Sequence, residues 1–244
     1  MLAAAVVVAF LSMLGSNQSL KLGRAINNVR SATHTGSMFR QFRLHSRQAN
    51  LIERETRLWV KNIVYGLRLC PWSGMVMDDM KVQVLDGDDM SSNIERIVRE
   101  AERLDDVNMK DQTTLIVLSN EIFSSFENFL LCVEDVEEML SESGFRCQLA
   151  TFHPLYTFQD SEAEEIDVTD YTNRSPYPTL HLLRYDDVHS AIQSYSEVHG
   201  SGEDADAPAT SRIWKNNKET LKKLGLEKAA QMLESIKAEA AQEN

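Results

Sequence analysis

The chain has 244 residues and a formal net charge of −12, with 25 basic and 37 acidic side chains. An acidic protein of this size is poorly suited to bind a nucleic-acid backbone or an anionic membrane surface, so we expect neither as a partner. Its three cysteines are odd in number and widely spaced, which indicates neither a disulfide framework nor a CxxC zinc pattern.

The first fifty residues differ from the rest of the chain. Residues 1–52 contain no Asp or Glu but carry six Lys or Arg side chains. The opening run "MLAAAVVVAFLSML" is shorter than a membrane span of about 20 residues and fits a signal-peptide core. The acid-free region after it has the composition of a transit peptide. We therefore expect residues 1–50 to be a targeting leader for a plastid or a mitochondrion, and a mature form without a membrane segment. A disordered N-terminus with an incidental apolar patch is the alternative.

Hydrophobic periodicity divides the remaining chain into alternating helices and strands. A capping box from Ser92 to Glu95 predicts one helix start, and Ser119 or Asn120 is expected to cap the next helix. The run "TTLIVL" is continuously apolar and β-branched, which is typical of a central strand covered on both faces. The expected helices are 51–67, 92–104, 122–140, 188–195 and 212–241, and the expected strands are 81–85, 113–118, 145–152 and 180–185.

This alternation predicts a single α/β domain, with a sheet of about four strands and helices packed on it. We expect the domain to comprise residues 51–195 and 211–228. Residues 196–210 are rich in Gly, Ser, Ala and acids, which favours a flexible acidic insertion. Residues 229–244 are expected to be a C-terminal helical tail.

Residues 153–179 form a long irregular segment between two expected strands, and such segments are usually functional or disordered. Its ends, "TFHPLYTF" and "YTNRSPYP", are aromatic and proline-rich, whereas its middle is acidic. We expect the two ends to meet near the edge of the sheet. Together with "GLRLCPW" these segments resemble the family known as domain of unknown function 1415. The resemblance covers roughly residues 53–225, implies no particular activity, and shows Trp72 where the family commonly has Phe.

The motif "NRS" suggests an anion-binding loop. Arg174 offers a charged planar donor fork suited to carboxylate or phosphate, and Asn173 and Ser175 add further polar groups. Arg184, at the end of the following strand, is a further candidate for anion binding. The alternative is a structural role, in which Arg174 pairs with a nearby acid and Asn173 ties down the loop.

Three side chains are candidates for catalysis. His153 follows a strand directly, His181 lies in the next strand, and the two imidazoles could share a pocket if those strands are neighbours. Each His is a candidate acid or base, or else a hydrogen-bonded anchor. Cys70 precedes Pro71 at a helix end and is a candidate nucleophile or a buried packing residue. No HxxxH or CxxC pair supports zinc, so we predict no metal. Cys132 and Cys147 are expected in the core.

The sequence is compatible with two functions. In the first, the protein is an enzyme acting on a small anionic metabolite, with Asn173, Arg174 and Ser175 holding the anion and His153 or His181 transferring a proton. In the second, it is a non-catalytic binding or scaffold module of an organelle. The absence of GxGxxG, P-loop, HExxH and GxSxG patterns counts against the common classes that use them. The sequence leaves both the cofactor and the oligomeric state undetermined.

Overall fold

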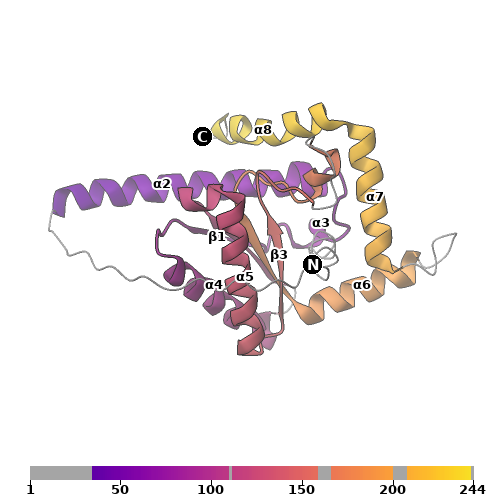
Figure 1. Ribbon diagram of the computed structural model, residues 1–244, viewed down its shortest axis with the longest axis horizontal. Coiled ribbons are helices and arrows are strands. Elements are labelled where there is room, and N and C mark those ends of the chain that lie inside the picture. The colour runs from indigo at the N-terminus through magenta and orange to yellow at the C-terminus, as the bar shows by residue number, and fades with distance from the viewer. Residues whose placement is uncertain (1–34, 110–111, 159–165, 200–207, 243–244) are drawn as a thin grey trace.

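The computed structural model describes residues 35–109, 112–158, 166–199 and 208–242, and shows helices packed around a four-stranded sheet (Figure 1). The strands are β1 (Lys81–Leu85), β2 (Thr113–Leu118), β3 (Cys147–Phe152) and β4 (Thr179–Arg184). The helices are α2 (Thr35–Trp59), α3 (Ser73–Val76), α4 (Met90–Asp105), α5 (Phe126–Ser143), α6 (Tyr185–His199), α7 (Ala209–Leu224) and α8 (Leu226–Gln242). A single α/β domain with four strands is confirmed.

The sheet is mixed, with the strand order β1-β2-β4-β3. β1 and β2 are parallel, and β4 is antiparallel to both β2 and β3. Consequently β1, β2 and β3 run in one direction, and their carboxyl ends lie at the same end of the sheet. Every residue of β2 and β4 is buried, which confirms the prediction of a central strand at 113–118.

Each face of the sheet carries its own hydrophobic core. On one face Ile116 packs with Ile97 of α4 and Phe129 of α5. On the other, Leu115 packs with Trp59 of α2 and Ile236 of α8. Alternation along each strand sends successive side chains to these two cores, so the sheet is covered on both sides.

α2 is longer than the sequence predicts. It starts at Thr35, crosses the expected leader boundary at residue 50 without a break, and continues into a π-helix at Val60–Tyr65. α8 lies beside α2 in Figure 1, and the Arg54 guanidinium donates to the carbonyl of Ala240 at 3.0 Å. The expected C-terminal tail is therefore part of the packed structure at Ile236 and Ala240, both fully buried. The apolar run at 1–14 and most of the expected insertion lie outside the described residues.

Three local predictions are corrected. α4 is capped by Asp89, whose carboxylate accepts from the backbone N–H of Ser92, so Ser92 is not the N-cap. Asn120 caps a short 3₁₀ helix at Glu121–Ser124, and Ser125 caps α5. The single helix expected over 212–241 is two helices, because Gly225 adopts a φ of +83° that L-residues rarely adopt. None of the described helices has the length and apolar composition that a membrane span requires.

Candidate functional site

The two ends of the long irregular segment meet beside the carboxyl end of β3, as the sequence predicts. The backbone N–H of His153 donates to the carbonyl of Asn173 at 3.1 Å. The amide of Asn173 donates to the carbonyl of Thr151 at 3.1 Å, and the Arg174 Nε donates to the carbonyl of Tyr156 at 3.1 Å. We call residues 153–158 and 166–178 the loop frame. Its acidic middle, 159–165, lies outside the described residues.

The imidazole of His153 is buried within the loop frame, where backbone groups and aromatic rings contact it. Its Nε2 donates to the carbonyl of Phe123 at 2.9 Å, and its Nδ1 accepts from the backbone N–H of Leu155 at 3.0 Å. The ring lies about 5 Å from the rings of Phe126 and Phe129. Burial lowers the pKa of this imidazole, which keeps it neutral. Both nitrogens that could transfer a proton are thus engaged by backbone groups.

Arg174 is also buried in the loop frame, with 8% of its surface exposed. Its guanidinium lies over the ring of Tyr171 and 4.0 Å from the carboxylate of Asp170. Burial raises the pKa of the Asp170 carboxyl, while a bond from the backbone N–H of Phe158 and the charge of Arg174 oppose that rise. The contacts favour the structural role that the sequence leaves open for Arg174, because its charge already has a buried partner.

The other two candidates for anion binding are likewise engaged. The hydroxyl of Ser175 donates to the carbonyl of Tyr177 at 2.5 Å. Arg184 lies at the other end of the strands from the loop frame. There its guanidinium donates to the carbonyls of Leu104 and Asp106 and pairs with Asp187 at 3.2 Å. The structure therefore groups Asn173, Arg174 and Ser175 but leaves Arg184 apart.

His181 and Cys70 are also buried. His181 neighbours Ala150 across the β3–β4 ladder, and its Nε2 lies 2.5 Å from the hydroxyl of Thr113. Since that hydroxyl donates to the carbonyl of Leu182 at 2.9 Å, the imidazole is its donor, and burial holds the pKa of His181 well below its ordinary value. Cys70 belongs to the core on the α2 face and is 2% exposed.

No group of metal-ligating side chains that could hold an ion occurs among the described residues. Cys132 is fully buried and Cys147 partly so, as expected of core residues, and burial raises their pKa to about 12 and about 11 respectively. Neither thiol forms a reactive thiolate near neutral pH.

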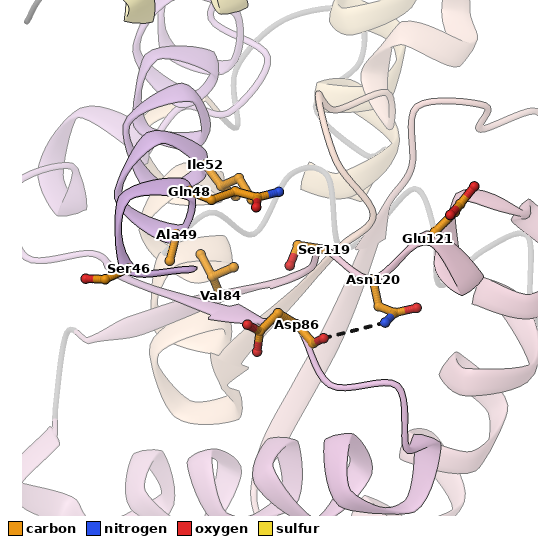
Figure 2. Close-up of a pocket in the computed structure, with 9 residues that line it drawn as sticks. All are labelled: Ser46, Gln48, Ala49, Ile52, Val84, Asp86, Ser119, Asn120 and Glu121. Atoms are coloured by element: carbon orange, nitrogen blue, oxygen red, sulfur yellow. Dashed lines mark hydrogen bonds between the residues drawn. The ribbon is translucent and has the colours of Figure 1, made fainter. Parts of the chain in front are cut away.

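A cavity of about 490 Å³ lies where β1 and β2 end, beneath α2 (Figure 2). In Figure 2, Gln48 and Ile52 extend from α2 toward Val84 and Ser119 on the sheet side. Asp86 lies at the lower rim, and its carbonyl accepts from the Asn120 amide at 3.5 Å. The cavity is lined by Ser46, Gln48, Ala49, Ile52, Val84, Asp86, Ser119, Asn120 and Glu121.

The chemistry of this lining is polar and acidic. The described residues that line it combine two carboxylates with hydroxyl and amide groups and a few apolar side chains, and none of them is basic. The carboxyl ends of parallel strands are a common location for ligand sites in α/β sheets. Sequence reasoning missed these residues because it assigned Asn120 to a helix cap and Gln48 to a leader, and gave Asp86 no role. Asp86 and Asn120 closely follow the parallel strands β1 and β2, and that position is the signal that could have found them.

A model of one protein family, described as a protein of unknown function (DUF1415), matches residues 51–231. No curated protein and no solved structure matches the chain.

Proposed function

Since the chain belongs to the DUF1415 family of proteins of unknown function, we propose a role from its own geometry: it is a non-catalytic module that binds a small neutral or cationic ligand bearing hydroxyl or amino groups. The observation that carries this proposal is the cavity of about 490 Å³ at the carboxyl ends of β1 and β2. Its volume lies within the range of small-molecule pockets, about 300 to 1,000 Å³.

The electrostatics of the cavity decide the ligand class. Carboxylates of Asp86 and Glu121 attract amines and accept hydrogen bonds from hydroxyls, while they repel phosphates and carboxylates. Gln48 and Ser119 supply both donors and acceptors, and Ile52 offers an apolar surface against the ligand's carbon skeleton. An anionic metabolite would find no positive partner among the described residues of this lining.

A thermal-shift screen of the full chain tests the proposal. Sugars, polyols and amines are expected to raise the melting temperature, and a size-matched set of carboxylates and phosphates is not. The shift should disappear in Asp86→Asn and Gln48→Ala. It should persist in Asp88→Asn, which removes an exposed carboxylate from the same loop but outside the cavity. Loss of the shift in all three variants, or in none, contradicts binding at this cavity.

The second candidate remains an enzyme acting on a small anionic metabolite, with Arg174 and His153 in the roles that the sequence suggests. The observation in its favour is that the loop frame brings His153 and Asn173 into direct contact. Against it stand the bonds at both imidazole nitrogens and the buried partner of Arg174. In the same screen, a shift with anions alone that His153→Ala or Arg174→Ala abolishes would favour this enzyme over the binding module.

We also propose that the module acts in an organelle, because the first 52 residues contain no acid and several arginines. The position of α2 limits where a leader could be cleaved. Ser46, Gln48 and Ala49 belong to the cavity wall, so a leader cut near residue 50 would remove that wall, whereas a cut before Thr35 would keep it. N-terminal sequencing of the organelle-imported protein distinguishes the two.

A further inference from the structure

β3 is an edge strand of the sheet, and the direction of its backbone groups can be assigned. The N–H of Tyr185 donates to the carbonyl of Arg146, so Arg146 faces β4. Because successive residues of a strand alternate, Cys147, Leu149 and Thr151 turn their N–H and C=O groups away from β4. The bond from Asn173 to the outward carbonyl of Thr151 agrees with this assignment.

Asn173 covers only one end of this edge. It pairs with Thr151 and with His153 just beyond the strand, much as a neighbouring strand would. Within the described part of the chain, no group pairs with the outward N–H and C=O of Cys147 and Leu149. Protein edges are usually protected by charged residues, proline or a bulge, yet "CQLATF" contains no charge and no proline.

A groove runs along this open stretch. It has a volume of about 260 Å³ and lies between β3 and the C-terminal half of α5. Leu140 of α5, Phe145 and Leu149 form its apolar part, and Glu137 of α5 stands at its side. A strand added at Cys147 and Leu149 would direct alternate side chains into this groove.

The charge of the groove identifies the kind of occupant. Burial, and then the charge of Glu134, raises the pKa of Glu137, so its carboxylate is poorly solvated. Among the described residues neither glutamate forms an ion pair with a basic side chain. A lysine or arginine placed there would relieve the repulsion between the two carboxylates and gain a charge-assisted hydrogen bond.

We propose that the open edge of β3 binds an extended peptide segment with a basic side chain, which adds to the sheet as a further strand and places its lysine or arginine beside Glu137. Backbone hydrogen bonds to Cys147 and Leu149 hold the segment, and the groove selects its alternate side chains. This surface is separate from the cavity under α2, and its occupant is another polypeptide.

Fluorescence anisotropy with the full chain tests the proposal, using the fluorescein-labelled peptide acetyl-Thr-Lys-Val-Lys-Val-Lys-Thr-amide. The same peptide with glutamates in place of its lysines is expected to bind at least about tenfold more weakly. A lysine peptide N-methylated at all internal residues keeps its charge but loses its donors, and should also bind about tenfold more weakly. Glu137→Gln should weaken binding about threefold, whereas Glu138→Gln on the exposed side of the same helix should not.

Three outcomes would overturn the proposal. Equal binding of the methylated and unmethylated peptides would show attraction by charge without strand addition. Equal effects of Glu137→Gln and Glu138→Gln would place the peptide elsewhere on the acidic surface. A stable dimer in sedimentation, together with no peptide binding, would show that the edge is occupied by a second copy of the chain.

Discussion

The loop frame and the cavity both lie at the carboxyl ends of the parallel strands, but their polar groups have opposite roles. In the loop frame the side chains of His153 and Asn173 are fully buried and donate to backbone carbonyls. In the cavity Gln48 and Asp86 are exposed. A buried irregular segment leaves backbone groups without a helix or sheet partner, so its side chains must supply the missing bonds. Dense polar residues in a loop can therefore indicate a structural role as well as a binding site.

This comparison has an energetic consequence. Substitutions in the loop frame should lower stability and leave ligand binding in the cavity unchanged, while substitutions in the cavity should do the reverse. Urea denaturation measures the free energy of unfolding, and thermal shift measures the ligand response.

The largest effect is expected for His153→Ala. The change removes two hydrogen bonds and a ring packed between Phe126 and Phe129, so it should lower the free energy of unfolding by about 3 kcal/mol. His189→Ala, at an exposed position of α6, should change it by less than about 0.5 kcal/mol. If His153→Ala keeps its stability but loses the thermal shift with every ligand, the loop frame has a binding role and the contrast with the cavity is wrong.

Arg174→Gln should lower the free energy of unfolding by about 2 kcal/mol, because it leaves Asp170 buried without its positive neighbour. The same substitution in an Asp170→Asn background should cost about 1 kcal/mol less, since no buried charge is then left behind. The double-mutant cycle measures this coupling by urea denaturation. If Arg174→Gln lowers the free energy of unfolding equally in both backgrounds, the stabilising role of Arg174 comes from its contacts with Tyr156 and Tyr171 alone.

Sequence reasoning was successful where the physical signal was local. Continuous apolar character identified β2. The meeting of the loop ends was also predictable from their composition. The partners of His153 were not, because its bonds go to the carbonyl of Phe123 and the N–H of Leu155, and no sequence pattern specifies a backbone acceptor 30 residues away. The cavity was missed because it is formed by three segments distant in sequence.

The pH dependence of stability gives a smaller test of the loop frame. Burial lowers the pKa of His153 and of His181, whereas in the unfolded chain both imidazoles take up protons near neutral pH. The unfolded state then binds more protons, so the free energy of unfolding falls as the pH decreases from about 7 to about 5.

His153→Phe should remove part of this fall, because the unfolded variant has one proton-binding group fewer. The comparison is made between urea midpoints of the wild type and the variant at both pH values. An unchanged pH dependence in His153→Phe would mean that this imidazole is protonated equally in both states.

The smallest effect on stability, and the largest on binding, is expected for Ala49→Leu. Ala49 lines the cavity from α2, where a volume of about 490 Å³ leaves room for three more carbons without displacing a neighbour. Leucine is also a good helix former, so the free energy of unfolding should change by less than about 0.5 kcal/mol. The added side chain would occupy the space proposed for the ligand, and the thermal shift should be lost. Asn50→Leu, one residue further along α2 and exposed, adds a similar apolar group outside the cavity and should keep the shift. If Ala49→Leu and Asn50→Leu respond alike to the ligand, the cavity is not the binding site, and the contrast with the loop frame would be one of stability alone.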